Sequence, residues 1–473
     1  MALATETRPR IIAALTAYAS RFHAGNAHQA CSPLGAWMLL AIMSPLTNGA
    51  TRAELEQTLG CSADEAREFV AELLANPHPI VNAVAAAWLD SRAECAAIAA
   101  WRKTLASAIQ TGKIPTQATA DAWADKHTRG AIKQFPLEIT SLTVLLVASA
   151  LATKAKWDEP YSTADVSQLG VTAWRRDGRE VREGHEVPEV RDELERRDRI
   201  EPTVVLHAPR DGREVAESGK VVFAQAPGAQ VIASTEAAGD VGVLISSSPE
   251  GLLVVSVIAA PSVATATAMR AAHEVVALAA GQPSPAKFRS LYELPLGKGH
   301  AWSITERHEK EPAPAADREH AQVFIPAWRT PAKTNDLLAP PTRGFEPLIE
   351  ALRQCLPPIP AGYKFGAAQT AVAEFNQFGF SAAAVSALDA EPRCARGGWA
   401  LPLMQTIRVR QAIVRFARPF AVVAVAQATQ YPNPNKSWIQ ILPNPFKGKA
   451  WHGIPIFSAW VTEPCEVEEE PWP

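Results

Sequence analysis

The amino-acid sequence predicts a large protein of the α+β class, because helix-start signals and apolar, strand-like runs both occur along the chain. The helix signals are clearest in the first third, where Ser32 precedes Pro33 and Ser62 stands three residues before Glu65. An evenly apolar run at 143–157 is typical of a buried strand. With 47% hydrophobic residues, the 473-residue chain can bury a large core.

Helix and strand patterns alternate through the first third of the chain. Ser32 and Pro33 predict the N-cap and first residue of a buried helix. Capping-box patterns at 51–54 and 62–65 predict two short helices on either side of Gly60. The segments that follow are a strand at 79–91, a helix at 96–109, a helix at 119–132 across the front of the main sheet, and a central strand at 143–157.

The middle of the chain is dominated by strands and charged loops. Residues 174–201 are dense in Arg, Glu and Asp, and a run of mixed sign is usually a solvated surface rather than a docking site. Paired strands joined by turns are expected at 220–234 and 242–259. Proline and alanine at 309–320 predict a loop.

The apolar stretch 11–19 has two interpretations. It follows two arginines and ends in Ala-Tyr-Ala, the crude pattern of a signal peptide. Its large apolar residues recur at helical spacing, which favours a retained first helix. We therefore expect a cytoplasmic protein, with secretion left open. The residues at helical spacing are Ile11, Leu15, Tyr18 and Phe22.

Charge and cysteine content exclude several classes of protein. A net charge of −3 gives no reason to expect nucleic acid or an anionic membrane as a partner. No apolar run approaches twenty residues, so we expect no membrane span. The six cysteines form no CxxC pair and lack a histidine at ligand spacing, so free thiols and no metal site are expected. They are Cys31, Cys61, Cys95, Cys355, Cys394 and Cys465.

No motif for catalysis stands out. The sequence has no nucleophile elbow, no HExxH, no Walker loop and no GxGxxG. His185, His273 and His308 each precede a glutamate but have no second ligand at helical spacing, so they are expected on the surface. We therefore expect a protein that is not an enzyme and needs no cofactor.

Five segments, in the family's order, resemble the serpins, the serine protease inhibitor family. The first runs from Ser-Pro-Leu-Gly to a Leu-Gly stop, and the last reads Gly-Ile-Pro-Ile-Phe up to Glu-Pro. Residues 321–338 also resemble a family strand, with Trp328 in place of another aromatic. The five segments are 32–60, 120–135, 143–161, 416–426 and 453–464.

The resemblance implies the serpin fold: about three β-sheets, eight or nine α-helices and an exposed reactive-centre loop. It implies a single domain at 1–464, a loop at about 377–405, and leaves 465–473 as an acidic tail. The overall pattern is that of a bacterial-type member and a monomer. Residues 162–320 carry almost no family motif, so their role stays open.

The stretch 373–398 resembles the serpin hinge and reactive loop. In the family an acidic or amide residue, a charged residue, Gly and Thr precede small residues. The glycine and alanines fit this pattern, but Phe378 and Phe380 depart from it. On its own, an alanine run after a glycine is usually a helix or a plain loop. The hinge positions are Gln377, Gly379, Phe380, Ser381, Ala382, Ala383 and Ala384.

The resemblance also implies the bond that a protease would attack. Counting about seventeen residues from Gln377, as is typical of serpins, reaches Arg393 and Cys394, with Arg396 as the fallback. An arginine there matches the specificity pocket of trypsin-like proteases. The alternative is an ordinary exposed loop arginine, since the segment from Cys394 to Phe416 is longer than is usual in the family.

Three further residues match positions that control opening of the main sheet. Trp157 matches the tryptophan at the top of the sheet (the breach), and Ser32 and Ser149 match the cluster beneath it (the shutter). Gly35 stands where the family has a second serine. Phe380 would meet a slot shaped for a small side chain, unless small residues provide room.

The function that the resemblance implies is inhibition of an Arg-specific, trypsin-like serine protease by suicide-substrate loop insertion. The alternative is a serpin-fold protein that binds partners or acts like a chaperone without inhibiting, because the hinge carries two phenylalanines. A group of four arginines has two interpretations: a site that binds a polyanion, or solvent-facing positions on a strand. They are Arg408, Arg410, Arg415 and Arg418.

Overall fold

A computed structural model describes most of the chain. The described residues are 7–23, 27–157, 160–169, 220–227, 230–339, 344–358, 363–380, 404–428 and 449–465. The charged segment 174–201 and the alanine-rich segment 381–400 lie outside them. No helix of the described ranges is long and apolar enough to cross a membrane.

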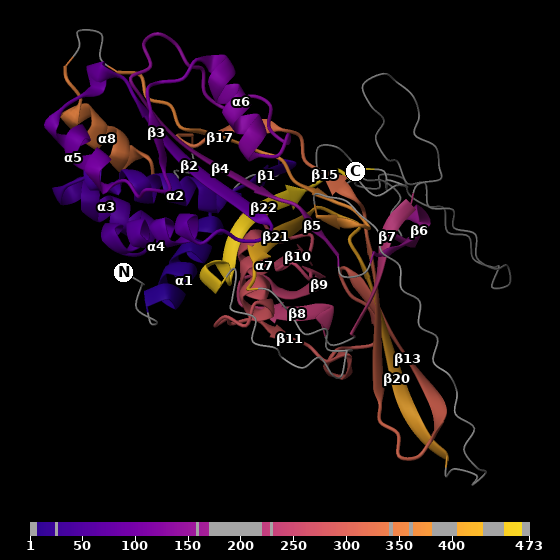
Figure 1. The fold of residues 1–473 in the computed structure, drawn as a ribbon. Helices are drawn as coiled ribbons and strands as arrows, with labels where there is room; N and C mark the ends of the chain where they lie inside the picture. The colour runs from indigo at the N-terminus through magenta and orange to yellow at the C-terminus, as the bar shows by residue number, and fades with distance from the viewer. Residues whose placement is uncertain are drawn as a thin grey trace, which may run out of the picture.

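Most helices gather at one end of the molecule, at the upper left of Figure 1. Ser32 caps α2 and the Ser62–Glu65 capping box starts α4, as predicted. The predicted cap at Thr51 is wrong, because Asn48 caps α3 and Thr51 is its N3 partner. The helices here are α1 (Thr7–Ala19), α2 (Pro33–Met43), α3 (Gly49–Leu59), α4 (Ala63–Ala75), α5 (Ala96–Thr104) and α8 (Glu346–Cys355).

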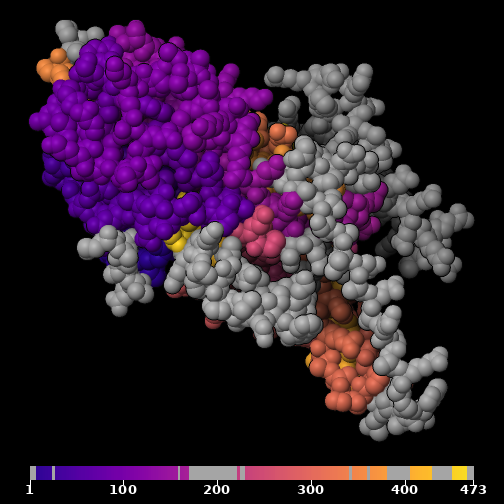
Figure 2. All heavy atoms as spheres, viewed as in Figure 1, coloured from indigo at the N-terminus to yellow at the C-terminus, as the bar shows by residue number. Residues whose placement is uncertain are grey.

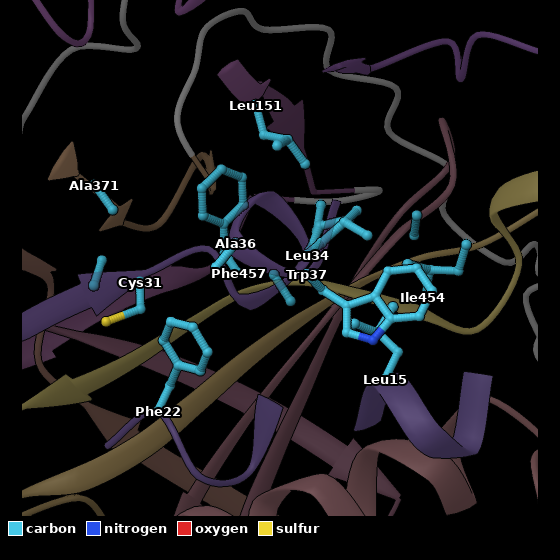
Figure 3. Packing of buried hydrophobic residues seen from close by; sticks show 14 of the residues in the cluster. Leu15, Phe22, Cys31, Leu34, Ala36, Trp37, Leu151, Ala371, Ile454 and Phe457 are labelled. Atoms are coloured by element: carbon cyan, nitrogen blue, oxygen red, sulfur yellow. The ribbon is translucent and has the colours of Figure 1, made fainter. Parts of the chain in front are cut away.

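A seven-stranded sheet forms the centre of the core. Its inner strands β10, β21 and β22 are buried along their whole length. Helix α7 (Thr265–Ala279) packs on one face and α1 and α2 pack on the other, so both faces are apolar. Figure 3 shows part of the packing on the side of α1 and α2. The order is β1 (Gln29–Cys31), β22 (Ile454–Val461), β21 (Phe420–Ala426), β10 (Leu252–Ile258), β9 (Gly239–Ser248), β8 (Ile232–Thr235) and β11 (Lys287–Phe288).

A six-stranded sheet carries a long two-stranded arm that projects from the body (Figures 1 and 2). The loop predicted at 309–320 is partly wrong, because β13 extends through Pro312 and β14 begins at Arg318. The order is β12 (Gly297–Lys298), β13 (Trp302–Pro312), β20 (Met404–Arg415), β14 (Arg318–Ile325), β7 (Lys220–Pro227) and β6 (Ser162–Asp165).

The third layer is interrupted. Helix α6 (Gln117–His127) covers β2 and β4 as predicted. The layer consists of β3 (Gln110–Gly112), β2 (Val81–Leu89) and β4 (Leu145–Thr153), of β16 (Lys333–Asp336) and β17 (Ala368–Ala371), and of β15 (Trp328–Arg329), β18 (Glu374–Phe375), β19 (Gly379–Phe380) and β5 (Ala155–Lys156). The described residues contain eight α-helices, as predicted, and five sheets where about three were predicted, since the third layer is divided; the α+β class is confirmed.

Candidate functional site

The interruption of the third layer is a cleft between β4 and β17. In the described part of the chain, β4 pairs only with β2, and β17 pairs only with β16. A cleft of about 370 Å³ separates them, and Leu151, Ala371 and Phe457 are among the residues that line it (Figure 3). Two strands that lie in one layer without pairing leave backbone donors and acceptors available to a further strand.

The floor of the cleft is a set of hydrogen bonds around the N-terminus of α2. The side-chain amide of Gln369 accepts from the Ser32 amide N–H and donates to the Ser32 carbonyl, both at 2.8 Å. The Ser149 hydroxyl donates to the carbonyl oxygen of Gly35 at 2.9 Å. A Cβ on Gly35 would lie 3.2 Å from Ser149 Oγ and 3.4 Å from Gln369 Nε2. β4 and β17 are thus each bound to the start of α2, and Gly35 leaves room for the two side chains.

The upper end of the cleft is closed by β19, which contains two of the predicted hinge residues. Strand β19 lies between β5 and β18, with Gly379 opposite Lys156 and Phe380 opposite Ala155. Both β19 residues are buried. A Cβ on Gly379 would overlap the carbonyl oxygen of Ala155, so only glycine permits this close approach. Strand β19 thus contributes two paired residues at the point where the cleft begins.

Trp157 binds the backbone of the turn that leads into β19. Its amide N–H donates to the Phe378 carbonyl at 3.1 Å, and its indole N–H donates to the Asn376 carbonyl at 2.9 Å. The Asn376 carboxamide oxygen accepts the amides of Phe378 and Gly379 at 2.9 and 3.1 Å. This turn is therefore fixed from both sides.

Tyr161 supports the same turn from the segment after Trp157. Its amide N–H donates to the Gln377 carbonyl at 2.9 Å. Burial raises the pKa of Tyr161 to about 12, and its hydroxyl donates to Ser246 Oγ at 2.9 Å. The phenol is therefore neutral at physiological pH and acts as a hydrogen-bond donor.

Phe380 has an aromatic pocket of its own. Only 3% of the residue is exposed, and its ring meets Trp328 edge to face at a centroid distance of 6.4 Å. Trp328 in turn stacks on Phe375 at 6.3 Å. The Phe380 ring thus packs on Trp328, whereas Gly35 has Leu151, Ser149 and Gln369 as its nearest neighbours.

The structure describes half of the predicted site residues and places them at the two ends of the cleft. Trp157, Gln377, Gly379 and Phe380 meet at the upper end of the cleft, and Ser32 and Ser149 lie at its floor. Ser381, Ala382, Ala383, Ala384, Arg393 and Cys394 lie outside the described residues.

Sequence reasoning missed three contributors, namely Gln369, Asn376 and the contact of Trp328 with Phe380. A signal was available only for Gln369, which is an isolated amide in a strand of small residues. The partners of Asn376 and Trp328 depend on chain segments that lie close only in the fold.

The three arginines of β20 and Arg418, which follows the strand, do not form an open anion site. Arg408 pairs with Asp317 at 2.7 Å and Arg410 pairs with Glu306 at 2.7 Å. Arg415 donates to the Gln168 carbonyl, and Arg418 donates to the carbonyls of Ala259 and His300. Structural partners therefore engage all four side chains, which favours the solvent-facing strand positions over a polyanion site.

His273 is not on the surface, contrary to the prediction. It is 3% exposed in α7, which packs on β10 and β21 of the core sheet. Burial lowers the pKa of His273 to about 3, so the imidazole is neutral. The residue borders a cavity of about 350 Å³ between α1 and α7. His308 lies on exposed β13, and His185 is outside the described residues.

The cysteines agree with the prediction where they are described. Cys31, Cys61, Cys95, Cys355 and Cys465 are free thiols. Burial raises the pKa of Cys61 to about 11, so this thiol stays protonated and unreactive. Cys394 lies outside the described residues.

Comparison with known proteins identifies the family. Residues 17–170 match the serpin (serine protease inhibitor) sequence profile, whereas no curated protein matches the sequence. Among solved structures, the thermophilic serpin tengpin shares 12% identity at a TM-score of 0.54, covering 98% of this chain and 95% of that chain. Serpin48 of the insect Tenebrio molitor shares 12% at 0.53, covering 98% and 99%.

Human thyroxine-binding globulin is a third relative in fold, with 13% identity at a TM-score of 0.55, covering 98% of this chain and 100% of that chain. At such identities these likenesses establish the fold alone. Together the comparisons show a serpin-family sequence match over residues 17–170 and a serpin fold across the chain.

Proposed function

We propose that this serpin inhibits a trypsin-like serine protease by suicide-substrate loop insertion, with Arg393–Cys394 as the attacked bond. The observation that carries the proposal is the open cleft with Phe380 already seated at its upper end. The protease serine would attack the carbonyl carbon of Arg393, release the new amino terminus at Cys394 and remain as an acyl-enzyme.

Insertion would continue the pairing that β19 begins. Because Phe380 lies opposite Ala155, the same antiparallel register would set Ala382 opposite Thr153 and Ala384 opposite Leu151. Small residues there suit a cleft that closes on the inserted strand. Each added backbone hydrogen bond contributes about 0.5–1.5 kcal/mol. Insertion of this kind is the known behaviour of inhibitory serpins and is carried over here as part of the proposal.

The experiment is incubation with trypsin followed by denaturing electrophoresis and mass spectrometry. We expect a covalent complex that survives SDS, with Arg393 at the acylated end. Arg393→Ala should abolish this complex, whereas the matched variant Arg396→Ala should keep it. If both variants form the complex, the assignment of the bond is wrong. Cleavage within the loop without any complex would contradict the inhibitor function.

A second candidate function is binding of a small apolar molecule between α1 and α7. The cavity there, about 350 Å³, is bordered by Ile12, Ala13 and His273, and both ring nitrogens of His273 lack a hydrogen-bond partner in the described residues. A ligand with one polar group could supply that partner. The relative thyroxine-binding globulin was solved in complex with thyroxine, so a serpin fold can carry such a molecule.

Thermal denaturation with added thyroxine, and with a set of apolar acids and phenols, distinguishes this candidate. A ligand that occupies the cavity should raise the melting temperature of the wild type and not of His273→Phe, whose ring reaches into the same space without a polar atom. If no compound shifts the wild type, or if the variant responds equally, binding at this cavity is refuted.

A further inference from the structure

The outer edge of the arm, which β13 and β20 form, has no strand partner along most of its length in the described ranges. Strand β12 covers only the base of this edge, where Gly297 lies opposite Ile304. From Thr305 to Glu311, β13 pairs on one side alone, with β20. The arm projects from the body (Figures 1 and 2). An unpaired edge of this kind is a template for a further strand.

The backbone groups of the even-numbered residues of β13 point outward along this edge. The Gly299 amide donates to the Trp302 carbonyl on the outer side at 2.8 Å. Since backbone groups alternate in direction along a strand, Glu306, His308 and Lys310 also direct their N–H and C=O groups outward. No hydrogen bond within the described residues engages these groups.

The unpaired stretch of the edge has its centre at His308. Its inner end is set by β12, which occupies the outer side of Ile304. Its outer end is Pro312, which has no amide to donate. These limits leave residues 305–311, three on either side of His308. Two such edges, related by a two-fold axis through His308, would therefore pair antiparallel over their whole length.

The charges on this stretch complement one another in that same register. A two-fold axis through His308 sets Glu306 opposite Lys310 of the second copy, and Arg307 opposite Glu309 of the second copy. The axis repeats each pair, so each pair of opposite charges occurs twice. Directly opposed side chains have their Cβ atoms about 4.5–5.5 Å apart, close enough for opposite charges to stabilise the pairing.

Neighbouring registers lack this match. Shifting the second copy by two residues in one direction would set Arg307 opposite Arg307, and the reverse shift would set Glu309 opposite Glu309. Like charges directly opposite each other destabilise a strand pair. A shift by one residue would set outward-facing backbone groups against inward-facing ones, so the ladder would lose its hydrogen bonds. One register therefore satisfies both the backbone and the charges.

From this match we infer that the arm is a dimerisation surface, at which β13 of one copy pairs antiparallel with β13 of a second copy around His308. The two arms would form one continuous sheet. The two bodies would lie at opposite ends of it, because the base of each arm meets the tip of the other (Figure 1). The inference does not depend on loop insertion, and it departs from the monomer that the family resemblance implies.

Contacts within one copy already hold these charges in position. Arg307 pairs with Glu309 at 2.5 Å, and Glu306 pairs with Arg410 at 2.7 Å. The side chains of Arg307 and Glu309 are nevertheless 56% and 33% exposed, so both retain surface for a second copy. Dimerisation would thus add opposite charges to side chains that are already ordered, which lowers its entropic cost.

Two charge reversals, Arg307→Glu and Glu309→Arg, test the pairing. Each variant presents like charges to its own kind across the axis, so its self-association should weaken about tenfold or more. A one-to-one mixture of the two variants should form a dimer again, because residues 307 and 309 of the two chains then carry opposite charges. Arg102→Glu is the matched control, since Arg102 is 49% exposed on α5 and pairs with Glu94.

Sedimentation velocity of the full-length proteins, measured from about 1 to 300 μM, gives the dissociation constant of the dimer. We expect the wild type and Arg102→Glu to dimerise in the upper part of this range, because the paired edge is short. A wild type that stays monomeric throughout would overturn the inference. A wild-type dimer that neither reversal weakens would also overturn it, because such a dimer uses another surface.

Cysteine crosslinking tests the register. Under mild oxidation His308→Cys should form a disulfide-linked dimer, because facing residues of a hydrogen-bonded pair have their Cα atoms about 5.5 Å apart. Thr305→Cys should not, since this register places its two copies about 20 Å apart. The wild type sets the background, because Cys465 is exposed. Non-reducing electrophoresis gives the yields, and equal yields from the two variants would refute pairing around His308.

Discussion

Replacing Phe380 by threonine should lower the stability of the intact protein rather than ease loop insertion. The sequence alone suggested that this ring obstructs insertion, but in the structure Phe380 is 3% exposed and rests against Trp328 before any cleavage. Its cost therefore does not fall on the insertion step. Removal of a buried aromatic ring at the edge of an existing cleft forfeits about 1.5–3 kcal/mol of burial, without the extra term for a new closed cavity.

The assay is urea denaturation of the intact protein, with the stoichiometry of inhibition measured in parallel. Phe378→Thr is the matched control, since Phe378 is only partly buried and should lose less. We expect Phe380→Thr to reduce the free energy of unfolding by about 1.5–3 kcal/mol while trapping no larger a share of the protease. A variant that is as stable as the wild type and a better inhibitor would refute this reasoning.

Three other variants probe the cleft and the core. Gly379→Ala should displace β19, because its Cβ would overlap the Ala155 carbonyl oxygen. Amide exchange at Phe380 should therefore become faster, and an unchanged exchange rate would contradict this prediction. Gln369→Ala should lose about 1–3 kcal/mol of unfolding free energy, because both bonds to Ser32 disappear, whereas Gln354→Ala at an exposed site should lose little. The pKa of His273 is about 3 in the folded protein and 6.5 in the unfolded chain. Below pH 6.5 only the unfolded chain binds the proton, so the free energy of unfolding falls by about 1.4 kcal/mol per pH unit, and above pH 6.5 this loss is absent. His273→Gln should flatten that part of the pH–stability curve, and an unchanged slope would show that other groups cause it.

The parts of the fold that depend on local sequence were predictable. Ser32 with Pro33 and Ser62 with Glu65 specify helix starts through contacts within one turn, and both starts occur where predicted. The predicted N-cap of α3 was wrong because a threonine can serve either as the N-cap or as the third helical residue. In the structure Asn48 is the N-cap and Thr51 is the third residue. Local chemistry alone does not distinguish these two registers.

The parts that depend on distant segments were not predictable. Residues 309–312 looked like a loop because of their charges and Pro312, yet β20, nearly a hundred residues later, pairs with them. His273 was expected on the surface because it has no second metal ligand at helical spacing, but α7 packs on the core sheet and the residue is buried. The pocket for Phe380 was missed because Trp328 reaches it from another strand. In each case a contact between remote segments decides the environment of the residue.

The heat resistance of the loop-cleaved protein, compared with that of the intact protein, decides whether the cleft receives the loop. Brief trypsin treatment gives the cleaved form, and calorimetry gives the two melting temperatures. If residues after Phe380 fill the cleft, the added ladder and buried area should raise the melting temperature of the cleaved form well above that of the intact form. Equal melting temperatures would contradict loop insertion in this serpin.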